Sequence, residues 1–119
     1  DKPKKNEPEY VFIHDMKSTS DKRTWVLAVN EKLGLGLKIE YNMKNLPYFM
    51  EWKSTAAGDY VIGLEPSNSS VYGRAYHEQN NSLHMLKPFE KETNELIFTV
   101  LDGDTEIKEA IEQFHRVFN

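Results

Sequence analysis

The sequence predicts an all-β protein, an antiparallel β-sandwich that ends in one C-terminal α-helix. Two observations lead to this prediction. Short apolar runs rich in β-branched and aromatic residues recur along the chain, separated by turn-forming residues, which is typical of a sandwich of seven or eight strands. After the turn at Asp102-Gly103 the period changes, and Ile107, Ile111, Phe114 and Phe118 recur at the spacing of an amphipathic helix.

Six runs are the clearest strand candidates: Tyr10–His14, Trp25–Val29, Leu35–Tyr41, Tyr48–Trp52, Tyr60–Glu65 and Leu96–Leu101. The third of these alternates apolar and polar residues, as a half-buried strand does. Val71–Tyr76 is expected to be a short irregular strand or an extended segment. The charged, proline-containing residues 1–8 are expected to form a flexible arm, and Asp104 or Thr105 is expected to cap the helix.

The composition of the chain argues against several classes of function. The chain has 119 residues and a net charge of -4, without the concentrated basic face of a nucleic-acid binder. No apolar stretch approaches the roughly 20 residues that span a bilayer, so we expect no membrane partner. The lack of cysteine excludes thiolate chemistry and suits a reducing, cytoplasmic location. The acidic and histidine residues show no metal-ligand spacing, and Gly34-Leu35-Gly36 precedes no helix, so neither a metal nor another cofactor is expected.

The stretch YVIGLEPSNSSVYGR, residues 60–74, places a carboxylate where an apolar strand is expected to end. Because side chains alternate along a strand, Gly63 is the same-face neighbour of Glu65, and its missing side chain leaves room beside the carboxylate. The simpler alternative is a solvent-facing glutamate at a strand end, next to a glycine at a bulge. Read as a site, the pattern predicts that a buried strand holds Glu65 at the mouth of a binding concavity.

Four other residues are candidates for contacts with a substrate. Trp52 shares a strand face with Tyr48 and could stack on the apolar face of a ligand, although the simpler alternative places both rings in the core. Asn68 could bind a hydroxyl group, or could simply be a turn residue. Arg74 could pair with the glutamate or with an anionic group of a ligand, or lie on the surface. His77 could approach the glutamate if the chain doubles back, or be a hydrogen-bonded loop histidine.

Two motifs carry a resemblance to a known family. They are Leu64-Glu65-Pro66, within LPYFMEWKSTAAGDYVIGLEPSNSSVYGR, and Leu86-Lys87-Pro88-Phe89-Glu90, within LHMLKPFEKETNELIFTVLDG. Together they resemble the C-terminal portion of aldose 1-epimerase-like proteins of the galactose mutarotase superfamily, and most of all an uncharacterised bacterial family within it. The resemblance covers about Glu7 to Asp102. The sequence departs from classical members at Pro66-Ser67, where they have Thr-Gln, and at Phe89, where they have glycine.

The resemblance implies a function and assigns one catalytic residue to this segment. Glu65 would be the general base of anomer interconversion in a small-molecule sugar, while the histidine that acts as the acid would lie upstream of this segment. Residues 1–119 would then be either a single domain or the C-terminal fragment of a larger mutarotase-like domain, and the fragment would be inactive alone. The alternative is a non-catalytic carbohydrate-binding or structural β-sandwich module. A sheet edge left exposed could also pair two copies as a homodimer.

Overall fold

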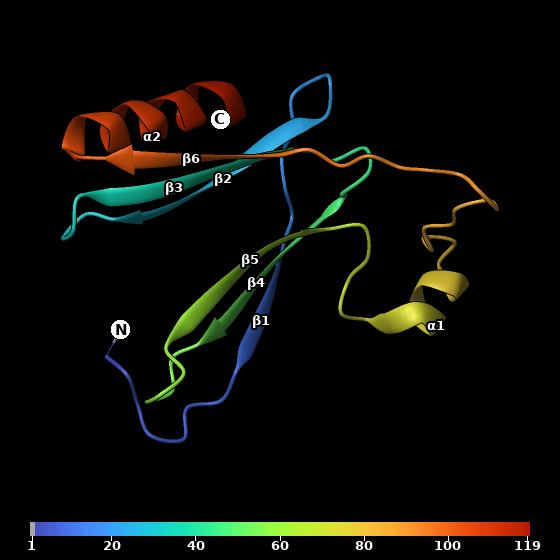
Figure 1. Ribbon diagram of the computed structural model, residues 1–119, viewed down its shortest axis with the longest axis horizontal. Coiled ribbons are helices and arrows are strands. Elements are labelled where there is room, and N and C mark those ends of the chain that lie inside the picture. The colour runs from blue at the N-terminus through green and yellow to red at the C-terminus, as the bar shows by residue number, and fades with distance from the viewer. Residues whose placement is uncertain (1) are drawn as a thin grey trace. The chain divides into compact units, whose positions relative to one another are not determined.

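The computed structural model describes residues 2–119, which divide into two compact units (Figure 1). Residues 2–16 and 45–91 form the first unit, and residues 17–44 and 92–119 form the second. Each unit contains a three-stranded antiparallel sheet and one helix. The elements in chain order are β1 (Tyr10–His14), β2 (Arg23–Asn30), β3 (Leu35–Asn42), β4 (Tyr48–Ser54), β5 (Val61–Ser67), α1 (Gly73–Gln79), β6 (Leu96–Asp102) and α2 (Asp104–Phe118).

The predicted fold class is confirmed: the sheets are antiparallel, and α2 is the C-terminal helix. The described residues contain six strands, however, fewer than the seven or eight expected. The prediction for Val71–Tyr76 was wrong, because α1 begins at Gly73. Gly73 has a φ of 83°, a conformation that glycine adopts without strain, and an ion pair between Arg74 and Glu78 spans one turn of the helix. Neither helix among residues 2–119 is long and apolar enough to cross a membrane.

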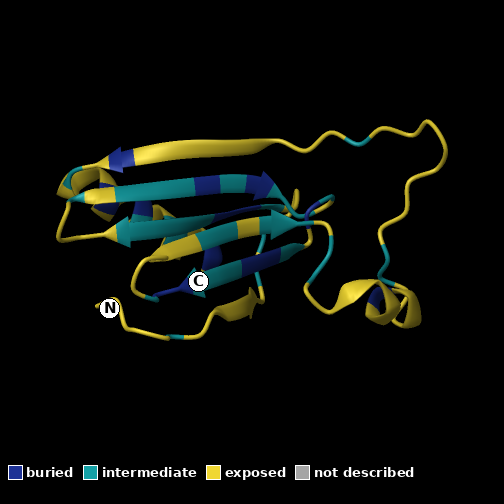
Figure 2. Cartoon of the chain, turned by 60° about the horizontal axis from the view of Figure 1, so that its bottom comes forward, coloured by how far each residue is buried: buried dark blue, intermediate teal, exposed yellow. Residues whose placement is uncertain are grey.

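In the first unit the strand order is β1-β4-β5, so β4 is central and the other two strands are edges. The core residues of β4 are Phe49 and Met50, which are 3% and 6% exposed. All five residues of β1 are exposed (Figure 2). The segment before β1 contacts the same unit, since Lys4 donates its backbone N–H to Thr55 and accepts one from Ala57.

In the second unit the strand order is β2-β3-β6, and α2 contacts all three strands. The ring of Trp25 lies 4.4 Å from that of Phe118 and 6.5 Å from that of Phe114, centroid to centroid. The apolar stripe of α2 therefore packs on its own sheet, as its spacing indicates. The expected cap was wrong: Gly103 is the N-cap residue and provides no side-chain bond, while Glu106 reaches back to accept the backbone N–H of Asp102.

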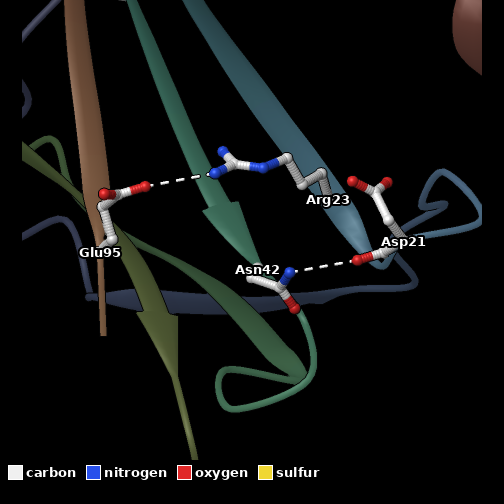
Figure 3. Close-up of polar contacts among 4 residues, drawn as sticks. All are labelled: Asp21, Arg23, Asn42 and Glu95. Atoms are coloured by element: carbon white, nitrogen blue, oxygen red, sulfur yellow. Dashed lines mark hydrogen bonds and ion pairs between the residues drawn. The ribbon is translucent and has the colours of Figure 1, made fainter. Parts of the chain in front are cut away.

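Polar contacts join the three strands of the second sheet near one end (Figure 3). Arg23 at the start of β2 donates to Glu95, just before β6, at 3.2 Å. Asn42 at the end of β3 donates its side-chain N–H to the backbone oxygen of Asp21 at 3.1 Å. Because both contacts are exposed, each contributes little to stability.

Candidate functional site

The register of β4 and β5 gathers candidate residues on one face of the first sheet. Trp52 lies opposite Gly63, Met50 opposite Glu65, and Tyr48 opposite Ser67. Directly opposed residues of antiparallel strands share a face, so the glutamate, the indole and the Tyr48 ring all belong to this face. We call this surface the Glu65 face. The sequence predicted a strand at each of these two places, although both strands extend two residues further than expected, to Ser54 and Ser67. Only the pairing of the two strands shows which of their residues lie side by side.

Gly63 creates the space in which the Glu65 carboxylate lies. A Cβ atom on Gly63 would stand 2.6 Å from Oε1 of Glu65 and 3.4 Å from Cβ of Trp52. The first distance is too short for non-bonded atoms, so the carboxylate occupies space that only a glycine leaves open. The prediction that Gly63 clears room beside Glu65 is confirmed.

The strand environment of Glu65 differs from the expected one. β5 continues through Pro66 to Ser67, so the glutamate does not end it, and β5 is an edge strand whose Val61 and Ile62 are 45% and 50% exposed. Glu65 itself is exposed. The expectation of a buried strand was wrong because an apolar run indicates burial only when neighbours cover it, and β5 has a strand on one side alone among residues 2–119. Pro66 is accommodated because an edge strand tolerates a missing N–H.

Trp52 is held by a residue that sequence reasoning did not connect with it. The indole Nε1 donates to Oε2 of Glu9 at 3.2 Å, across 43 positions of sequence. The side chain of Trp52 is half-buried. An indole fixed at its polar edge presents its ring in a constant orientation, as a stacking platform requires. No local pattern marks Glu9, because its role depends on contact between segments distant in the chain.

His77 lies at the far end of the Glu65 face and is fully buried, at 0% exposure. Its Nε2 is 3.2 Å from the backbone nitrogen of Ser70 and 2.9 Å from the Ser70 hydroxyl oxygen, and its Nδ1 is 2.8 Å from Oγ of Ser82. The ring also makes an edge contact with Tyr48, with centroids 5.5 Å apart. Both nitrogens of His77 are thus engaged within the protein.

The remaining two candidates are exposed. Asn68 follows β5 directly, in a loop where Ser67 Oγ accepts the backbone N–H of Ser69 at 3.2 Å. Arg74 donates from Nε to Glu78 at 2.8 Å, so the suggested pairing with Glu65 is not the one present. The hydrogen bond with Glu78 raises the pKa of the Arg74 guanidinium, which stays cationic. With 77% of its side chain exposed, Arg74 remains accessible to an anionic ligand.

The opposite face of the same sheet carries a histidine paired with a glutamate. Nε2 of His14 lies 3.1 Å from Oε2 of Glu51, and the His14 ring meets the Phe49 ring edge-on at 5.4 Å. The register places both partners on the face opposite Glu65. His14 therefore does not share the Glu65 face.

Comparisons with known proteins agree with this geometry at the level of the fold. A family model described as Domain of unknown function (DUF4432) matches residues 1–100. The crystal structure of a protein from Klebsiella pneumoniae, titled a "putative aldose 1-epimerase", superposes with a TM-score of 0.87 at 23% identity. The match covers 98% of this chain and 31% of that one, so the chain spans about a third of that structure's length. No curated protein matches the sequence.

Proposed function

The chain belongs to the DUF4432 family, and from this premise we propose that it is part of an aldose 1-epimerase-like, carbohydrate-active protein in which Glu65 is the general base. The observation that carries the proposal is the placement of an exposed carboxylate over Gly63, on the same sheet face as a fixed indole. The fold shared with the Klebsiella protein supports it. A cytoplasmic location, which suits a chain without cysteine, is part of the proposal.

The proposed chemistry is the interconversion of the two anomers of a cyclic aldose. Glu65 removes the proton of the anomeric hydroxyl group while an acid protonates the ring oxygen. The bond between C1 and the ring oxygen breaks, giving the open-chain aldehyde, and rotation about C1–C2 presents its other face. Closure reverses the proton transfers and yields the other anomer. Trp52 would stack on the apolar face of the sugar, and Asn68 would contact its hydroxyl groups.

The carboxylate is suited to a base because it is accessible and unoccupied. Within residues 2–119 no hydrogen bond or ion pair involves the Glu65 carboxylate. A base must reach the proton that it removes, and an exposed carboxylate can do so. The edge position of β5 leaves the same side chain open to a ligand.

A second candidate function is sugar binding without catalysis. It is favoured by the surroundings of two histidines of the first unit, one in α1 and one in β1. His77 is buried with both nitrogens engaged, and His14 lies on the opposite face, paired with Glu51. Neither is placed as the acid that ring opening requires. A protein in which this segment supplied only Glu65, Trp52 and Asn68 could bind a sugar without interconverting its anomers.

The deciding experiment measures anomer exchange, by NMR or polarimetry, over a panel of aldoses in the natural protein that carries residues 1–119. Replacement of Glu65 by Gln retains the shape of the side chain and removes the base. We expect the exchange rate to fall on the order of 10²-fold or more. The variant Glu112→Gln, a matched change at an exposed glutamate of α2, should retain the rate. Equal rates in Glu65→Gln and wild type would exclude Glu65 as the base, and sugar binding without exchange in wild type would favour the second function.

A further inference from the structure

The loop that follows β5 is tied to α1 by a single buried ring. We propose that His77 is a positioning residue: it holds Ser70 and thereby fixes residues 67–70, the loop that carries Asn68 directly after β5. This inference rests on the proposed function for its consequence in sugar binding. The structural part, the attachment of the loop to the His77 ring, stands on contacts alone.

The hydrogen bonds assign the proton on the ring. The backbone N–H of Ser70 can only donate, so Nε2 of His77, at 3.2 Å, must accept and carries no proton. Nδ1 then carries the proton of the neutral ring and donates to Oγ of Ser82 at 2.8 Å. The Ser70 hydroxyl oxygen lies 2.9 Å from the same Nε2, which accepts, so the hydroxyl group is the donor in this contact. Ser82 in turn donates its backbone N–H to the carbonyl oxygen of His77 at 2.9 Å.

Packing fixes the ring on which these bonds depend. His77 is wholly buried, and its ring makes edge contacts with those of Tyr48 and Tyr76 at centroid distances of 5.5 and 5.3 Å. Tyr48 belongs to the central strand β4 and to the same face as Glu65. The ring therefore connects a rigid strand with the loop. Direct contact between His77 and a substrate would require the ring to leave this position, whereas Asn68 is exposed.

The loop itself contains the features of a segment that needs an anchor. Ser67 Oγ accepts the N–H of Ser69 at 3.2 Å, and Ser70 Oγ accepts that of Tyr72 at 3.4 Å, so local bonds bend the chain but attach it to no other element. Serine hydroxyl groups commonly bend the backbone in this way. The backbone N–H and the hydroxyl group of Ser70, both in contact with Nε2 of His77, join the loop to α1. Loss of the contacts between Ser70 and His77 should let the exposed Asn68 side chain sample a wider range of positions.

Two near-isosteric substitutions separate positioning from packing. In His77→Gln the side-chain amide reaches the place of Nε2 and can still accept from Ser70. In His77→Asn the amide reaches only the place of Nδ1 and can still donate to Ser82. Each variant retains one bond and loses the other. Exchange of the Ser70 amide hydrogen, followed by NMR in the natural protein that carries residues 1–119, reports the loop bond directly.

We expect the Ser70 amide to exchange roughly 5-fold faster in His77→Asn than in His77→Gln, since a protein hydrogen bond contributes about 1 kcal/mol. We also expect His77→Asn to raise the KM for the aldose with less effect on kcat, and to add little in the presence of Asn68→Ala. Equal amide exchange in both variants, or effects of His77→Asn and Asn68→Ala that multiply, would overturn the proposal.

The ring ¹⁵N shifts of wild-type His77 test the assignment without any variant, which covers the case in which His77→Asn fails to fold. The proposal requires the proton on Nδ1, and a proton on Nε2 would contradict it. If the wild-type protein neither binds nor acts on any aldose, the proposed function fails. Amide exchange and the ¹⁵N shifts still decide whether His77 holds the loop.

Discussion

Oε1 of Glu65 lies 2.6 Å from the point where a Cβ atom on Gly63 would stand. The two residues share a face of β5, one pleat apart, and the carboxylate fills the space that the glycine leaves. The position of the candidate base therefore depends on the absence of a side chain two residues earlier.

The variant Gly63→Ala tests this dependence. The new methyl group meets the end of a flexible side chain, so Glu65 can rotate away at small cost, while alanine is favoured over glycine within a strand by roughly 0.5–1 kcal/mol. We expect thermal stability to be unchanged or slightly raised and Glu65-dependent anomer exchange to fall. In the presence of Glu65→Gln the same change should have no further effect on exchange. A loss of stability together with full activity would contradict the prediction.

Glu9 should control the mobility of the Trp52 indole. Its hydrogen bond to Nε1 is exposed, so Glu9→Ala should lower the free energy of unfolding by no more than about 1 kcal/mol. The fluorescence anisotropy of Trp52, measured with Trp25 replaced by Phe, should fall in Glu9→Ala. Glu9→Gln retains an acceptor and serves as the control. Identical anisotropy in wild type and Glu9→Ala would show that the bond does not orient the ring.

Alkaline pH should destabilise the second unit through Tyr41. This side chain is 1% exposed, and burial raises the pKa of its hydroxyl group to about 12, from 10.0 in the unfolded chain. A group whose pKa is raised on folding contributes stability that is present in full below the unfolded value and is lost as the pH rises toward the folded value. The free energy of unfolding should therefore fall between pH 10 and 12.

The variant Tyr41→Phe isolates this contribution from that of other groups that titrate at high pH. It should make the decline of stability between pH 10 and 12 less steep, and remove the part of the phenolate absorbance change that occurs near pH 12. Denaturant titrations at several pH values provide the measurement. A decline of the same slope in both proteins would mean that Tyr41 does not carry it.

The ring of Phe118 should be a main anchor of α2. It is 7% exposed, and its centroid is 4.4 Å from that of Trp25. Phe118→Ala should lower the free energy of unfolding by about 3 kcal/mol and shift the fluorescence of Trp25 toward that of an exposed indole. The neighbouring Val117, 42% exposed, provides the matched control, since Val117→Ala should cost less than about 1 kcal/mol. Equal losses in both variants would contradict this role.

The sequence alone determined the elements whose residues contact their own neighbours along the chain. Alternation over Leu35–Tyr41 located β3, and the 3.6-residue stripe from Ile107 to Phe118 located α2. When an element buries one face, its apolar residues recur at the period of a strand or a helix, and the sequence shows that period. The alternation of side chains along a strand also placed Gly63 and Glu65 of β5 correctly on one face. Helix α1 was not predicted from the sequence, because it is only seven residues long and has no apolar stripe.

Tertiary structure decided what depends on residues far apart in the chain. Whether an apolar run is central or at an edge depends on its neighbours, so Tyr60–Glu65 could not reveal that β5 is exposed. The bond between Trp52 and Glu9 spans 43 positions and leaves no local pattern. His77 could be recognised as a candidate, but its burial between Ser70 and Ser82 follows from the return of the chain over β4. Local periodicity records which side of a segment is buried, whereas only the packed chain determines what buries it.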